Sequence, residues 1–141
     1  NPRSWDHCLI VVETGGMRIV HWGDNRHNPP DDIWQALGHI DMALLPVDAS
    51  QHVMGHIHVQ AIVDRLQPRI VVPHHYYIWD VVQRQSTLQT CDDWVNEHEV
   101  VERIAGSKRI YRIEEMDKLE AAVHYFGDNV AFDKEAWMAG T

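Results

Sequence analysis

The chain alternates between short apolar runs and turn-forming segments. Two β-branched runs come first, over residues 8–12 and 17–21, and the segment between them contains Gly15 and Gly16. Apolar runs joined by a glycine-containing turn are typical of a β-hairpin. We therefore predict that residues 8–12 and 17–21 form two paired strands.

A helix and a buried strand are predicted next. Pro30 precedes apolar residues at helical spacing from Ile33 to Ile40, with Gly38 near the end of this segment. Proline at the start and glycine at the end are common helix boundaries. The run 42–47 is continuously apolar and has the length of a strand buried on both faces.

A second helix connects this strand to another. Asp48 or Ser50 can cap a helix that runs to about Leu66, because Pro68 cannot continue it. The segment 69–72, in which three apolar residues come after Arg69, follows at once and is predicted to be a strand. The order strand, helix, strand implies a right-handed crossover and a partly parallel sheet.

The pattern is weaker in the second half of the chain. We predict a helix over 90–104 and a strand over 109–113, and the tail 116–141 fits either a hairpin around 127–129 or a helix. No linker or repeat divides the sequence. Residues 1–141 are therefore expected to form a single domain of the α/β class, with a mixed sheet and flanking helices.

Composition narrows the class of function. The net charge is -9 and only 12 residues are lysine or arginine, which makes a nucleic-acid partner unlikely. The apolar runs are far shorter than the ~18 residues of a membrane span, so no membrane partner is expected. Two isolated cysteines favour a reducing, cytoplasmic location. The chain begins with Asn1, and we expect it to be a processed product or a piece of a longer protein.

Histidine is unusually frequent, with 11 residues in the chain, and two groups stand at strand ends. His21 and Asp24 close the second predicted strand, and His74 and His75 follow the strand over 69–72. Catalytic groups gather at the carboxyl ends of strands in α/β sheets. Taken singly, Asp24 is explained by an ordinary solvated turn and each strand-end histidine by packing or surface exposure, and the occurrence of two such motifs in one sheet keeps the functional alternative open.

A third histidine group lies in the second predicted helix. His52 and His56 are four residues apart, a spacing that places both rings on one helix face and can bind a metal. That face continues into apolar positions, which favours packing for His56. His52 stays a candidate near the site because it stands close to the end of the preceding strand.

The order of these motifs resembles the C-terminal half of metallo-β-lactamase-superfamily hydrolases, in the branch of lactonases and metal-dependent hydrolases. The resemblance covers residues 1–80 and rests on four motifs in register: His21-Trp22-Gly23-Asp24, Leu44-Leu45-Pro46-Val47, His52-Val53-Met54-Gly55 and Pro73-His74-His75-Tyr76. It implies half of a four-layer αββα sandwich, with the site at the sheet edges between the two halves.

The resemblance also implies a site. Asp24 matches the catalytic carboxylate that bridges two metal ions, and His75 matches a late histidine ligand, with His21, His52 and His74 near the site. The implied cofactor is zinc or another divalent transition metal, two ions in the complete protein. The implied reaction is attack by a metal-bound hydroxide on a small-molecule ester, lactone, amide or phosphoester.

The chain departs from this family in one respect. The family's main metal motif, H-x-H-x-D-H, belongs to the N-terminal half, and no such string occurs here. We therefore expect the parent protein to be an enzyme and the isolated chain to be inactive without the missing half. The alternative is a non-catalytic binding module that covers its exposed sheet by forming a homodimer. A nuclease of the same superfamily is a third hypothesis, which the acidic composition disfavours.

Overall fold

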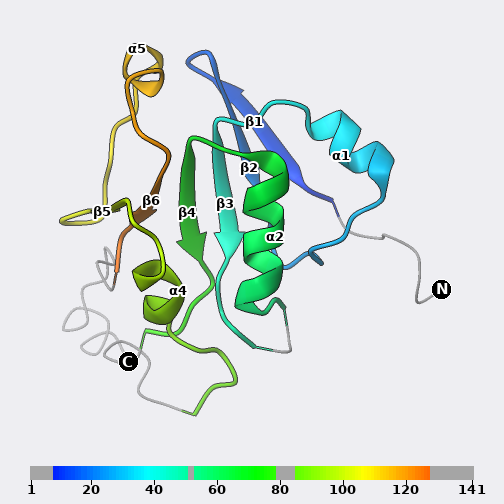
Figure 1. The fold of residues 1–141 in the computed structure, drawn as a ribbon, viewed down its shortest axis with the longest axis vertical. Helices are drawn as coiled ribbons and strands as arrows, with labels where there is room; N and C mark the ends of the chain where they lie inside the picture. Colours follow the sequence, from blue (N-terminus) through cyan, green and yellow to red (C-terminus); the bar gives the residue numbers. More distant parts are fainter. Residues whose placement is uncertain (1–7, 51–52, 79–84, 128–141) are drawn as a thin grey trace, which may run out of the picture.

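Six strands form one mixed sheet in the described part of the chain, in the order β1-β2-β3-β4-β6-β5 (Figure 1). The computed structural model describes residues 8–50, 53–78 and 85–127. The strands are β1 (Ile10–Thr14), β2 (Met17–His21), β3 (Met42–Pro46), β4 (Ile70–His74), β5 (Val101–Arg103) and β6 (Ala122–Tyr125). The helices are α1 (Asp31–Leu37), α2 (His56–Leu66), α4 (Asp92–Asn96) and α5 (Ile113–Met116).

The first four strands follow the hydrophobic pattern. β1 pairs antiparallel with β2, with Ile10 opposite His21, and β2, β3 and β4 run parallel to one another. β6 and β5 extend the parallel part of the sheet beyond β4. The predicted hairpin, the α/β class and the partly parallel sheet are therefore confirmed.

The main core lies on the sheet face that α1, α2 and α4 cover. Val20, Ala43, Leu45 and Val71 point from the strands into this core and are almost completely buried. Trp94 of α4 packs into the same cluster. At roughly 25 cal/mol for each Å² of apolar surface removed from water, this burial is what holds the helices on the sheet.

The opposite face is covered at one end only. Met17, Met42 and Ile70 are buried there against Met116 of α5. Toward the β1 edge, Ile10 and Val12 are 56% and 46% exposed, although alternation places them on this same face. The sheet therefore presents an open apolar region beside the covered one.

The second predicted helix begins later than expected. α2 begins at His56, with Gly55 in an extended conformation as its N-cap. Asp48 does not cap it: its carboxylate accepts hydrogen bonds from Ser50 Oγ and from the backbone N–H of Met54, which hold the preceding loop. The predicted shared helical face of His52 and His56 stays a prediction, because His52 lies outside the described residues.

The predictions for the second half of the chain were largely wrong. Residues 90–104 contain the short helix α4 and then β5, because Val101 pairs with Val123 of β6 in the sheet. The predicted strand 109–113 has no partner strand, and Ile113 begins α5 instead. Residues 122–125 form β6, and 128–141, including part of the expected hairpin, lie outside the described residues.

Candidate metal centre

Three acidic or imidazole side chains follow the carboxyl ends of three neighbouring parallel strands. Asp24 comes after β2, Asp48 after β3 and His75 after β4. Because the three strands run in the same direction, their carboxyl ends lie at one edge of the sheet. The fold therefore brings together residues that are far apart in the sequence.

The turn that carries Asp24 is fixed by its neighbours. Gly23 has a φ of +60°, a conformation that glycine adopts without steric cost. Asn25 donates hydrogen bonds from its side-chain amide to the carbonyls of Trp22 and Cys8, at 2.6 and 3.0 Å. The backbone around Asp24 is therefore held in place while its own side chain stays 62% exposed.

His75 occupies an unusual backbone conformation at the end of β4. Its φ is +58°, in the left-handed region that few residues other than glycine adopt. The pairing of β3 with β4 continues to this point, since Val47 N–H donates to the carbonyl of His74. The abrupt change of direction at His75 follows a fully paired strand, and conformations of this kind cluster at functional sites.

The imidazole of His75 lies between two carboxylates. Its Nε2 atom is 3.6 Å from Asp24 Oδ1, and its Nδ1 atom is 3.8 Å from Asp48 Oδ2. Asp24 and His75, which the resemblance assigns to one site, are therefore neighbours in the structure. Asp48 differs from Asp24 in its surroundings, because its side chain is completely buried.

Sequence reasoning missed Asp48 as a site residue. It treated this aspartate as a helix cap, although Asp48 stands after an apolar strand in the same way as Asp24 and His75. The expectation that functional groups gather at the carboxyl ends of strands, which identified Asp24 and His75, would also have identified Asp48. Its buried carboxylate is held by Ser50 Oγ at 2.5 Å and by the Met54 N–H at 3.3 Å.

His21 and His74 lie beside the centre, on the open face of the sheet. Their rings stack with centroids 4.6 Å apart. Burial, together with the nearby His21 and His75 rings, lowers the pKa of His74 to about 4. A neutral His74 next to the site adds no positive charge that would repel a metal ion.

Asp24 and His75 fit a divalent metal in chemistry and in spacing. An imidazole nitrogen and a carboxylate oxygen about 3 to 3.6 Å apart can both reach one zinc ion through bonds of ~2 Å. Across the described ranges, however, no group of three or more His, Cys, Asp and Glu side chains is arranged to hold a metal. Asp48 does not complete such a group, because it faces the other nitrogen of His75. Among the described residues, Asp24 and His75 therefore offer two neighbouring donor atoms that could contact one metal ion.

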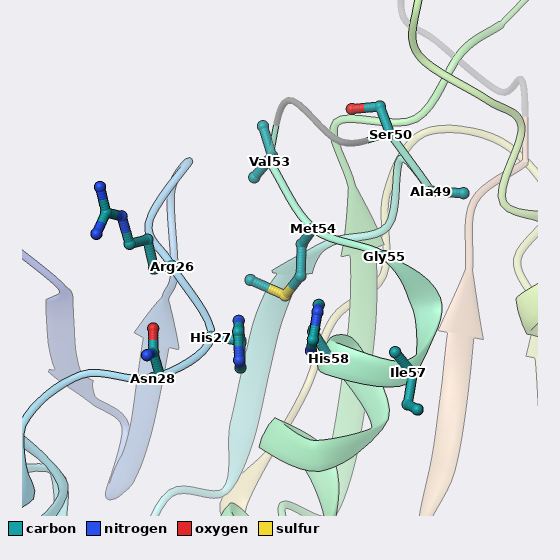
Figure 2. A pocket seen from close by; sticks show the side chains of 10 residues that line it. All are labelled: Arg26, His27, Asn28, Ala49, Ser50, Val53, Met54, Gly55, Ile57 and His58. Carbon is teal, nitrogen blue, oxygen red and sulfur yellow. The ribbon is translucent and has the colours of Figure 1, made fainter.

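A cavity of about 440 Å³ opens next to the loop that carries Asp48. It lies between the segment that follows β2 and the first turn of α2 (Figure 2). His27 and His58 both line it, with their rings stacked against each other at a centroid distance of 3.7 Å, and the Met54 side chain lies near them (Figure 2). Burial lowers the pKa of His27, and the nearby His58 ring contributes to the same effect.

Comparison with known proteins places these residues in a family. The family model described as a beta-lactamase superfamily domain matches residues 3–75, which include Asp24, Asp48 and His75. A metal-dependent hydrolase of Thermococcus onnurineus is 38% identical over 73 residues, which are 51% of this chain and 32% of that protein. A metal-dependent hydrolase of Methanosarcina mazei is 34% identical over 75 residues, 53% of this chain and 32% of that protein. The matched segment thus covers about a third of these relatives.

A solved structure gives the same fold. A Thermotoga maritima protein described as a Zn-dependent hydrolase of the metallo-β-lactamase superfamily superposes with a TM-score of 0.66 and 23% sequence identity. The match covers 83% of this chain and 57% of that protein. The predicted metallo-β-lactamase fold is confirmed by this likeness. Among the described helices, none combines the length and apolarity that a membrane span requires.

Proposed function

The chain belongs to the β-lactamase superfamily with the metallo-β-lactamase fold, and we propose that it supplies one half of the active site of a metal-dependent hydrolase. The observation that carries this proposal is the approach of Asp24 and His75 to 3.6 Å at one sheet edge. The names of the relatives support metal dependence. Zinc is the proposed metal because its preferred ligands include both side chains.

Each residue of the centre has a proposed role. Asp24 is exposed enough to bind an ion from solvent, and His75 offers a nitrogen on the same side. A bound divalent metal would lower the pKa of a water molecule and so provide hydroxide at neutral pH. The chain's own contribution is to fix the two donors: Gly23 and Asn25 hold the Asp24 turn, and the end of β4 holds His75.

The remaining ligands are proposed to come from sequence outside this chain. A catalytic zinc site generally has three protein ligands and an open position, and Asp24 with His75 supply two. With two donors the ion stays mostly solvated, so neither tight binding nor an activated hydroxide is expected. The isolated chain is therefore expected to bind zinc weakly and to hydrolyse no substrate.

The cavity that His27 and His58 line is the proposed place for the non-reacting part of the substrate. It shares Ser50 and Met54 with the loop that holds Asp48. A substrate reaching from Asp24 and His75 past this loop would enter the cavity. Its lining is mixed, with apolar and imidazole groups, which suits a small ester, lactone, amide or phosphoester.

Activity measurements on two forms of the protein test the proposal. The chain alone and a longer protein extended at Asn1 by its native upstream sequence would be loaded with Zn²⁺ and given a panel of ester, lactone, amide and phosphoester substrates. We expect turnover only from the extended protein, and its loss in Asp24→Ala. Sub-micromolar zinc affinity and turnover by the chain alone, lost in Asp24→Ala, would refute the half-site. Turnover that survives Asp24→Ala would refute the role of this centre.

A second candidate function is supported by the open sheet face. Ile10 and Val12 of β1 are large apolar residues and are about half exposed. A chain without the other half of the sandwich would cover this face by pairing with a second copy, and two-fold dimers are the commonest solution. In that case the chain would act as a self-associating module without catalysis.

A further inference from the structure

We propose that Asp48 is a positioning residue for His75: its buried carboxylate keeps the imidazole proton on Nδ1 and leaves the Nε2 lone pair directed toward Asp24 and a metal. This inference rests on the proposed function, because that function makes His75 a metal ligand. The tautomer that it assigns to His75 is a property of the metal-free chain and can be measured separately.

The geometry assigns each nitrogen of His75 to a different carboxylate. Nε2 lies 3.6 Å from Asp24 Oδ1, and Nδ1 lies 3.8 Å from Asp48 Oδ2. Nδ1 is also buried and makes no hydrogen bond to the described residues. A proton on Nδ1 would point toward the Asp48 carboxylate, and a small movement of the ring would close the remaining distance to a hydrogen bond.

Burial decides which carboxylate controls the proton. The Asp48 side chain is completely buried, whereas the Asp24 side chain is 62% exposed and screened by water. The two carboxylates lie at nearly equal distances from the His75 ring. A charge in a partly buried setting, with an effective dielectric constant of ~20, interacts about four times as strongly as a charge in bulk water. The imidazole proton is therefore placed on Nδ1, beside Asp48, and the exposed Asp24 faces the unprotonated nitrogen.

The orientation of Asp48 is itself fixed. Ser50 Oγ donates to Oδ2 at 2.5 Å, the same oxygen that faces His75, and the Met54 N–H donates to Oδ1 at 3.3 Å. Its backbone carbonyl accepts a hydrogen bond from the Gln89 N–H at 2.8 Å. These contacts use both carboxylate oxygens and hold them in place.

This arrangement serves a metal ligand. A histidine binds a metal through the nitrogen that lacks a proton, and a carboxylate on the other nitrogen fixes the tautomer and the ring orientation. Loss of such a partner typically lowers metal affinity about 10- to 100-fold. Asp48 would therefore act on the metal through His75, without touching the ion.

Nitrogen NMR of the metal-free chain tests the tautomer directly. Protein labelled with ¹⁵N-histidine would be studied with a chelator present at pH ~8.5, about two units above the ordinary histidine pKa of ~6.5. Long-range ¹H–¹⁵N correlations distinguish the Nδ1–H and Nε2–H forms, and His75→Gln identifies the His75 signals. We expect the Nδ1–H form to dominate for His75. Dominance of the Nε2–H form would overturn the proposal without any further variant.

Variants separate the role of Asp48 from general effects on folding. Asp48→Asn, which removes the negative charge beside Nδ1, should move the His75 proton to Nε2. Asp41→Asn is the matched control: Asp41 pairs with His39 at 2.9 Å, so the His39 ring should respond and His75 should not. An unchanged His75 tautomer in folded Asp48→Asn would overturn the proposal.

A Zn²⁺ titration adds the link to function. We expect the dissociation constant for Zn²⁺ to rise about 10-fold or more in Asp48→Asn and to stay unchanged in Asp41→Asn. Equal affinities of the wild-type chain and folded Asp48→Asn would overturn the positioning role. If the wild-type chain binds no Zn²⁺ at His75, the proposed function fails. The role of Asp48 is then still decided by the His75 tautomer measured in the metal-free chain.

Discussion

His75 Nε2 lies 3.6 Å from Asp24 Oδ1, although two helices and two strands separate these residues in the chain. The contact exists because β2 and β4 flank β3 and all three run in the same direction. The residues that follow parallel strands meet at one edge of the sheet. The position of Asp24 therefore depends on the turn immediately after β2.

Replacing Gly23 with alanine should disturb the centre as well as the fold. Gly23 has a φ of +60°, and a Cβ there would lie 3.4 Å from Asn25 Nδ2, which holds the turn. We expect Gly23→Ala to lower the free energy of unfolding by about 1 kcal/mol and to weaken Zn²⁺ binding. Chemical denaturation and calorimetry measure the two effects.

Gly38→Ala is the matched control for this substitution. Gly38 has a φ of +57°, but a Cβ there meets no atom within 4 Å. It should cost a similar free energy of unfolding and leave Zn²⁺ binding unchanged. Equal losses of zinc affinity in the two variants would mean that the Gly23 turn has no special part in the centre.

Acid should destabilise the fold through His124. Burial lowers the pKa of His124, although the nearby Glu102 carboxylate opposes this effect. The Nδ1 atom of His124 lies 2.8 Å from the Tyr111 hydroxyl. A lowered folded-state pKa means that the stabilisation is fully present above the unfolded pKa of ~6.5 and is lost as the pH falls toward the folded value. Each proton taken up on unfolding lowers the free energy of unfolding by ~1.4 kcal/mol per pH unit.

Denaturation of wild type and His124→Gln between pH 7 and pH 4 checks this prediction. As the pH falls, the free energy of unfolding of the wild type should decrease more steeply than that of the variant. The difference between the two slopes should correspond to the uptake of at most one proton on unfolding. Parallel pH profiles would show that His124 is protonated equally in the folded and unfolded chains.

The two cysteines should differ sharply in reactivity. Cys8 is exposed, whereas Cys91 is completely buried, and burial raises the pKa of the Cys91 thiol to about 12. The thiolate is the reactive form, so only about one Cys91 in ten thousand would be reactive at pH ~8 even if reagent reached it. We expect one labelled thiol per native chain, two in denaturant, and none in native Cys8→Ser. Rapid native labelling of Cys8→Ser would contradict the burial of Cys91.

Self-association should depend on the open face of the sheet. Val12 is 46% exposed on β1, and burying such residues contributes roughly 25 cal/mol per Å² to association. We predict a dimer by light scattering and a monomer for Val12→Lys. Ile57→Lys is the control, because Ile57 is 77% exposed on α2, which covers the other face. A wild-type monomer, or a dimer that survives Val12→Lys but not Ile57→Lys, would contradict the assignment of this face.

The sequence predicts this fold well where apolar runs are continuous. β1 to β4 follow from such runs, and the ends of β2 and β4 indicate Asp24 and His75. Residues 90–104 were misassigned because pairing with β6 overrides the local helical pattern. A sheet partner that lies far away in the chain leaves no local signal.

Asp48 illustrates a different limit. An aspartate before an apolar helical pattern is a common N-cap, so local propensity favours that interpretation. In the structure its carboxylate instead organises the loop before α2 and faces His75. The choice between the two depends on where α2 begins, and Gly55 rather than Asp48 is its N-cap.

The central claim is that Asp24 and His75 bind the same metal ion, and a ¹⁵N NMR titration of the histidine-labelled chain with Zn²⁺ tests it most directly. We predict that Zn²⁺ shifts the Nε2 resonance of His75 and leaves that of His39, which lies at the opposite end of β3, unchanged. The shift should require at least 10-fold more Zn²⁺ in Asp24→Asn, because one of the two donors is weakened. A His75 Nε2 resonance that does not respond to Zn²⁺, or that responds identically in Asp24→Asn, would contradict the account.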